Sequence, residues 1–183
     1  MPIADVLRVF TDEHGAHGNH LGIVVEDGTP LTPQRRQAIA AELGYAETVF
    51  FQDLASAALR IHTPAVELPL AGHPLVGASW FLRQQLGRVA HTLRPALAAE
   101  VATWTEDGVT WIRARVADTP PFEYVELENE EAVRAVQPAP RWGKHYLWAW
   151  VDRDAGRVYA RLLAPDFGVP EDPATGSAAL ALA

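Results

Sequence analysis

Two segments of this chain repeat one arrangement of arginine, proline and glycine. The first reads RIHTPAVELPLAGHPLVGASWFL and the second reads RLLAPDFGVPEDPATGSAALAL. Each begins with Arg-x-x-x-Pro on an expected strand and passes through a proline-containing loop into an expected helix. The repeat aligns the run from His73 to Gly77 with the run from Asp172 to Gly176. Two such junctions predict two related halves that face one shared cleft.

The start of each expected helix is suited to an anion. His73 and Asp172 are expected at or near the helix caps, with Pro74 and Pro173 in the first turns. The free N–H groups of a first turn carry partial positive charge, and glycine lets a ligand or another backbone come close. In a single copy, proline and glycine could simply form the turn between a strand and a helix. The repetition of the arrangement is what favours a shared site.

Composition limits the partners. The 183 residues suffice for one ordinary domain or two small ones, and 49% apolar residues with six Trp and six Phe can build a core. A net charge of −8 argues against nucleic acid and membrane surfaces as partners. It leaves a small anionic organic substrate possible, because a few local donors outweigh a screened net charge.

The chain contains no cysteine, which excludes disulfides, thiolate metal ligands and thiol catalysis. Its beginning, MPIADVLRVF, carries an acid early and has no long apolar stretch, so we expect no signal peptide. No apolar run approaches the roughly 18 residues that a membrane span needs. These features together predict a cytoplasmic protein without a membrane partner.

The order of strand and helix signals predicts an α+β fold. A helix is expected at residues 32–44, where Thr32 can cap the start and Gly44 the end, and another at 73–87. Asp107-Gly108 and residues 153–156 each mark a hairpin between alternating runs. A boundary near Pro120-Pro121 would divide the chain into a first domain, 1–119, and a second, 120–183, which we expect to be incomplete at its C-terminus.

With these residues in view, the chain resembles the PhzF-like family of phenazine biosynthesis proteins, which has the diaminopimelate epimerase fold. The matching stretches are FTDEHGAHGNHLGIVV, IAAELGYAETVFF, LRIHTPAVELPLAGHPLVGASW and RLLAPDFGVPEDPATGSAA. The resemblance implies two similar domains, each a curved, mostly antiparallel sheet wrapped around a central helix. It also implies isomerisation by proton shuttling at a site between them, without cofactor or metal.

The resemblance assigns site residues one by one. It makes Glu47 the proton carrier, with His73 and Asp172 as further catalytic residues that orient the substrate or relay a proton. Its substrate-binding positions fall on Gly72, Gly176 and Ser177. We expect a homodimer. The chain departs from the family at Ala46, where Ser is usual, at His20, where Pro is usual, and beyond the Gly-Ser-Ala helix, where relatives continue.

The residues around Glu47 suit a base of raised pKa. Tyr45, Val49, Phe50 and Phe51 would partly desolvate the carboxyl, which raises its pKa. Epimerases of this fold use two thiols, which this chain lacks. We therefore expect a single carboxylate to take a proton from the substrate and return it to another position. Such a mechanism gives isomerisation rather than racemisation.

There are three alternatives to the isomerase: a metal site, nucleic-acid stacking and an inactive binding protein. His14, His17 and His20 recur every third residue, but the glycines between them predict a flexible turn and no metal site. Trp148 and Trp150 lack a basic patch, so they indicate core or interface rather than nucleic-acid stacking. The third is a catalytically inactive binding or assembly protein that keeps the fold, which Ala46 and the short second domain favour. Such a protein would bind its ligand without exchanging a carbon-bound proton.

Overall fold

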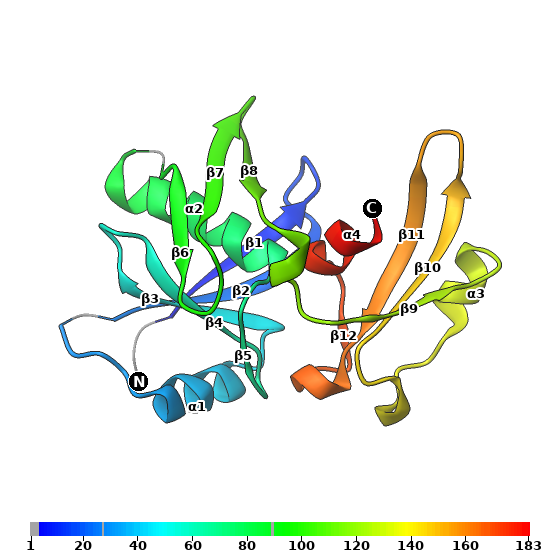
Figure 1. Ribbon diagram of the computed structural model, residues 1–183, viewed down its shortest axis with the longest axis horizontal. Helices are drawn as coiled ribbons and strands as arrows, with labels where there is room; N and C mark the ends of the chain where they lie inside the picture. The colour runs from blue at the N-terminus through cyan, green and yellow to red at the C-terminus, as the bar shows by residue number, and fades with distance from the viewer. Residues whose placement is uncertain (1–3, 27, 89) are drawn as a thin grey trace.

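The protein folds into two β-sheets with four α-helices, as the computed structural model shows for residues 4–26, 28–88 and 90–183 (Figure 1). The first sheet has the order β1-β2-β3-β4-β6-β7-β8, with β5 beside β4, and the second has the order β12-β11-β10-β9. The first sheet contains β1 (Ala4–Thr11), β2 (His17–Val25), β3 (Glu47–Asp53), β4 (Ala58–His62), β5 (Glu67–Leu68), β6 (Thr92–Pro95), β7 (Val101–Glu106) and β8 (Val109–Arg113). The second contains β9 (Glu123–Glu126), β10 (His145–Asp152), β11 (Arg157–Leu163) and β12 (Glu171–Asp172).

The helices lie between and beside these sheets. They are α1 (Pro33–Leu43), α2 (Gly72–Leu86), α3 (Glu130–Ala135) and α4 (Gly176–Leu182), with short 3-10 turns η1 (Val116–Asp118), η2 (Pro140–Trp142) and η3 (Pro165–Phe167). The first sheet curls around α2, and α4 lies between the two halves of the molecule (Figure 1). Most neighbouring strands are antiparallel; the β2–β3, β4–β6 and β9–β10 pairs are parallel. The expected α+β class with curved, mostly antiparallel sheets is confirmed.

The ends of α1 are those that the sequence predicts. The Thr32 hydroxyl accepts a hydrogen bond from the Arg35 N–H, and Gly44 ends the helix in the left-handed conformation at φ 67°. Ile39 and Ala40 pack on Val24 and Phe50 of the first sheet. Local capping and one apolar stripe are therefore enough to place this helix.

Both expected hairpins are present. Asp107 and Gly108, at φ 51° and 79°, join β7 to β8, and the turn after Asp152 joins β10 to β11. An Asp-Gly pair favours this turn because both central residues need positive φ.

One hydrophobic cluster runs through both halves. Leu75 of α2 and Leu59 of β4 belong to the same buried cluster as Leu162 of β11, Phe167 and Ala178 of α4. The first sheet ends at Arg113 and the second begins at Glu123, so the expected boundary falls in the connection between them. The division into two domains stays a prediction, because this core is continuous.

The structure corrects the register of the sequence repeat. α2 begins at Gly72 after Ala71, and α4 begins at Gly176 after Thr175. His73 therefore lies in the first turn of α2, near the cap as expected, whereas Asp172 lies on β12 before the loop that leads to α4, so its expected place at the cap of that helix is wrong. The alignment on the two prolines caused the error, since one of them lies inside α2 and the other in the loop before α4.

Two ion pairs mark the correct register. Arg60 contacts Glu67 at 2.7 Å, and Arg161 contacts Glu171 at the same distance. In both copies the glutamate opens the motif Glu-x-Pro-x-x-Gly, and its glycine is the first residue of the helix. The true counterpart of Gly72 is therefore Gly176, and that of His73 is Ser177.

In the part of the chain that the structure describes, no helix has the length and apolar character that crossing a bilayer requires.

Candidate active site

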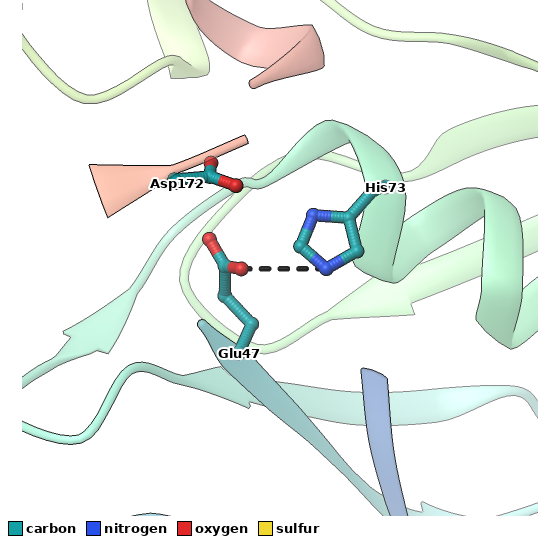
Figure 2. A group of neighbouring side chains, drawn as sticks. All are labelled: Glu47, His73 and Asp172. Carbon is teal, nitrogen blue, oxygen red and sulfur yellow. Dashed lines mark ion pairs between the residues drawn. The ribbon is translucent and has the colours of Figure 1, made fainter. Parts of the chain in front are cut away.

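Three ionisable side chains from distant parts of the chain meet at one buried point. Glu47 is the first residue of β3, His73 is the second residue of α2, and Asp172 is the last residue of β12. Their exposed fractions are 5%, 1% and 3%, and one ligand-type atom from each lies within 4.8 Å of the others. Figure 2 shows the Glu47 carboxylate pointing toward the imidazole of His73 and the carboxylate of Asp172.

Strand pairing brings these residues together. Parallel pairing of Glu47 with Leu21 fixes the start of β3 inside the first sheet. Antiparallel pairing of Asp172 with Leu162 holds β12 at the edge of the second sheet. The two sheets thus each deliver a carboxylate to the first turn of α2.

Burial dominates the chemistry of Glu47. The pKa of its carboxyl is raised well above the ordinary value, first by desolvation and second by the nearby charge of Asp172. Glu47 Oε2 lies 3.4 Å from His73 Nε2, yet neither atom has a hydrogen-bond partner among the described residues. A buried acid with a free oxygen is thus poised to exchange a proton.

Burial acts in the opposite direction on His73. Desolvation lowers the pKa of the imidazole to about 4, although the charge of Asp172 and the backbone of His20 favour its protonation. The ring is therefore neutral at neutral pH and carries a hydrogen on only one nitrogen.

Asp172 is held by three hydrogen-bond donors. Asn19 Nδ2 donates to Oδ1, the Ala174 N–H donates to the same oxygen at 3.3 Å, and the Thr175 hydroxyl donates to Oδ2 at 2.6 Å. The charge of Asp172 also contributes to the raised pKa of Tyr146, about 12, after burial and Tyr124. These donors fix the carboxylate as a permanent neighbour of Glu47 and His73.

The two helix starts touch through glycine. A Cβ on Gly72 would lie 2.9 Å from Gly176 Cα and 3.1 Å from the Ser177 nitrogen. We call this contact the glycine seam. It brings the backbones at the starts of α2 and α4 into direct contact.

A cavity of about 850 Å³ reaches the glycine seam between β1, β8, α2 and α4. Gly72, Gly176 and Ser177 line it, together with apolar side chains such as Phe10 and Trp80. The three ionisable side chains are not part of this lining. A ligand in the cavity would therefore meet the seam first.

The structure brings the six residues assigned from the sequence into two groups. Glu47, His73 and Asp172 are buried together, whereas Gly72, Gly176 and Ser177 line the cavity at the glycine seam. Two further residues, Asn19 and Thr175, bind Asp172. Asn19 and Thr175 lie within the stretches GAHGNH and EDPATGSA that carried the resemblance, but neither was assigned a contact. Ala46 directly precedes β3 and supplies no hydroxyl beside Glu47. His14 and His17 extend into solvent, and His20 Nε2 accepts a hydrogen bond from Arg8.

Glu47, His73 and Asp172 have the residue types of a metal site. The oxygens of Asp172 are, however, already occupied by three donors. Glu47 Oε2 and His73 Nε2, which have no hydrogen-bond partner among the described residues, lie 3.4 Å apart, beyond an ordinary hydrogen bond. A metal ion at this point would compete with the three donors for the oxygens of Asp172.

Comparison with known proteins points to one family. The model of the PhzC-PhzF family, described as phenazine biosynthesis-like protein, matches residues 7–131 and 94–183. The chain is 32% identical to trans-2,3-dihydro-3-hydroxyanthranilate isomerase of Pseudomonas chlororaphis, over 86% of this chain and 70% of that protein. It is 30% identical to the protein of the same name from Pseudomonas aeruginosa, over 97% of this chain and 77% of that protein.

Solved structures agree in fold. A PhzF family protein from Enterococcus faecalis superposes with a TM-score of 0.73 at 20% identity, covering 98% of this chain and 79% of its own. A predicted epimerase from Pseudomonas aeruginosa gives a TM-score of 0.66 at 23% identity, with coverage of 98% and 79%. At these identities the likeness establishes the fold alone.

Proposed function

Because the chain belongs to the PhzC-PhzF family of phenazine biosynthesis-like proteins, we propose that it moves a proton on a small carboxylate-bearing carbon acid, with Glu47 as the proton carrier. The family resemblance and the class, an isomerase, are confirmed by the family match and by the names of the relatives. The identity of the carrier and the absence of a cofactor are our proposals.

The observation that carries the proposal is the state of Glu47. Its carboxyl is buried, its pKa is raised, and Oε2 has no hydrogen-bond partner in the described residues. A general base works best when its pKa lies near the working pH, which burial achieves for a carboxylate.

The reaction balances without a redox partner. The Glu47 carboxylate forms an O–H bond as a C–H bond of the substrate breaks, and the electron pair moves into the adjacent conjugated system. Glu47 then delivers the proton to another carbon and becomes a carboxylate again. Nothing is oxidised or reduced, so the step needs no redox cofactor.

The glycine seam is our candidate for binding the negative charge. The first residues of α2 and α4, Gly72 and Gly176, lie in backbone contact, and both belong to first turns whose N–H groups lack helical acceptors. Each donor aimed at a developing anion contributes about 3–4 kcal/mol when its removal is measured. His73 and Asp172 would orient the substrate or relay a proton.

The substrate named for the relatives, trans-2,3-dihydro-3-hydroxyanthranilate, is the first compound to test. We propose that Glu47→Gln lowers turnover of this compound by about 10²–10⁴-fold, because Gln cannot accept a proton. Glu42→Gln, on the exposed face of α1, is the matched control and should leave turnover unchanged.

Two results would overturn the proposal. One is turnover by the Glu47→Gln protein within tenfold of the original, and the other is loss of turnover after treatment with a metal chelator. If the original protein binds the compound without converting it or exchanging a proton, the inactive binding protein becomes the better account for this ligand.

A further inference from the structure

We propose that Asn19 is a positioning residue that keeps the imidazole hydrogen of His73 on Nε2, where it faces Glu47. The inference rests on the proposed function, because it matters for turnover only if Glu47 carries the proton. It adds a residue to which the sequence assigned no role.

The geometry around Asn19 fixes the orientation of its amide. Asn19 lies on β2 with an exposed fraction of 4%, and Nδ2 donates to Asp172 Oδ1. The same nitrogen lies 3.3 Å from His73 Nδ1. A carboxylate offers only acceptors, so the Asp172 contact requires the amide nitrogen, and not the amide oxygen, on this side.

The second N–H of the amide then faces His73 Nδ1. An N–H in that position pairs with a lone pair, which requires the single ring hydrogen on Nε2. The His20 backbone competes for Nδ1: a bond to it would be made by Nδ1–H, since Nε2 has no hydrogen-bond partner among the described residues. A doubly protonated ring would bring Nδ1–H against the amide N–H. Asn19 therefore favours one neutral tautomer.

The other groups that face the ring are few. They are Glu47 from β3, Asp172 from β12 and the backbone of His20 from β2. The Asp172 charge and the His20 backbone favour protonation, whereas burial opposes it and lowers the pKa to about 4. The neutral ring on which the tautomer argument depends is thus supported independently.

The tautomer of His73 influences whether the Glu47 carboxyl is ionised or protonated at the start of a catalytic cycle. Nε2–H, 3.4 Å from Oε2, interacts favourably with the ionised, proton-accepting carboxylate. The opposite tautomer would direct a lone pair at Glu47 and favour its protonated form. Loss of Asn19 should therefore raise the pKa of Glu47 further and move the acid limb of kcat/KM to higher pH.

The test is the nitrogen-15 NMR spectrum of the histidine rings in the ligand-free protein, with His73 assigned by comparison with His73→Gln. We expect the Nε2–H pattern for His73. In Asn19→Leu, which removes the amide at similar volume, we expect half or more of the rings to change tautomer and the acid limb to move to higher pH. Asn129→Ala, which removes the remote cap of α3, should change neither.

An Nδ1–H pattern in the original protein, the tautomer that could donate to the His20 carbonyl, overturns the inference. So does an unchanged Nε2–H pattern in Asn19→Leu. If Asn19→Leu does not fold, Asn19→Ser takes its place and should give a mixture of tautomers; an unmixed Nε2–H pattern counts against the inference. The spectrum needs no turnover, so an active Glu47→Gln would refute the proposed function and leave the tautomer result standing.

Discussion

At Glu47 and His73, burial shifts the pKa values of two groups in opposite directions although their nearest atoms lie only 3.4 Å apart. It disfavours the anion of one and the cation of the other, so both are driven toward their neutral forms. The pair therefore lacks the strong attraction of a fully charged ion pair, and its two nearest atoms are not hydrogen-bonded to each other. That state suits a carrier that must both take and release a proton.

Replacement of Glu47 by Gln should stabilise the protein at neutral pH. The raised pKa means that ionised Glu47 costs folding free energy above its unfolded pKa, and each pKa unit is worth about 1.4 kcal/mol. We expect Tm to rise by about 2–4 °C per kcal/mol at pH 8 and the difference to vanish below about pH 4. Thermal unfolding at both pH values measures this, and equal Tm values at pH 8 would contradict it.

At the glycine seam, alanine should be tolerated less well at position 72 than at position 176. A Cβ on Gly72 would meet backbone at 2.9 Å, whereas a Cβ on Gly176 would come no closer than 3.3 Å to Gly72 Cα. Gly72→Ala should therefore destabilise by about 1–3 kcal/mol and Gly176→Ala by less. Urea unfolding of both variants tests the order; the reverse order would mean that the seam is not this tight.

Single residues differ in how far the sequence reveals them. Glu47 could be assigned because the ETVF stretch carries the family resemblance, and its apolar neighbours in sequence predicted the raised pKa. Asn19 could not, because its partners His73 and Asp172 are 54 and 153 positions away. Only the folded chain brings these polar groups into one buried network.

Among the elements, local signals placed α1, both hairpins and, to within one residue, α2, but they did not place the start of α4. Thr32 and Gly44 cap α1 through contacts within a few residues. The other two helices begin after Ala71 and Thr175, and neither side chain makes a capping hydrogen bond. The start of α4 depends instead on the strand β12, which no local pattern specified.

The packing of α1 depends on a buried ion pair. Arg36 Nε lies 2.6 Å from Glu26 Oε1, with side chains 4% and 2% exposed. Arg36→Met would leave Glu26 buried without its cation, so we expect a loss of about 3–5 kcal/mol in unfolding free energy. The exposed pair Arg157–Asp152 is the control, and Arg157→Met should cost less than about 1 kcal/mol. Equal losses in chemical denaturation would contradict the assignment.

In the whole molecule, one hydrophobic core spans the two segments that the sequence predicts to be separate domains. The boundary expected near residue 120 follows from a proline-rich connection, whereas the largest hydrophobic cluster contains residues from both sheets. Neither the parallel strand pairs nor this shared core has a local signature, since both arise from contacts between distant segments. The fold class could be predicted, and the way the halves join could not.

A shared core predicts one unfolding transition. Leu162 of the second sheet is 1% exposed within that cluster, so Leu162→Ala should destabilise the entire chain by about 2–5 kcal/mol. Calorimetry should show a single peak that moves to lower temperature. Two separate peaks, with only one displaced, would show that the halves unfold independently.

The homodimer expected from the sequence remains a prediction. Large apolar side chains are exposed around the cavity, among them Phe10, Trp80 and Trp111, and such a group commonly marks a contact surface. Light scattering during size-exclusion chromatography should give twice the mass of one chain. A mass of one chain at micromolar concentration would contradict it.

Deuterium labelling distinguishes Glu47 from any other carrier of the proton. The protein is incubated with trans-2,3-dihydro-3-hydroxyanthranilate in D2O, and carbon-bound deuterium is followed by NMR. We expect label in the compound with the original protein and at least a hundredfold slower labelling with Glu47→Gln, because a positioned base is lost. Labelling by Glu47→Gln at the original rate would show that another residue carries the proton.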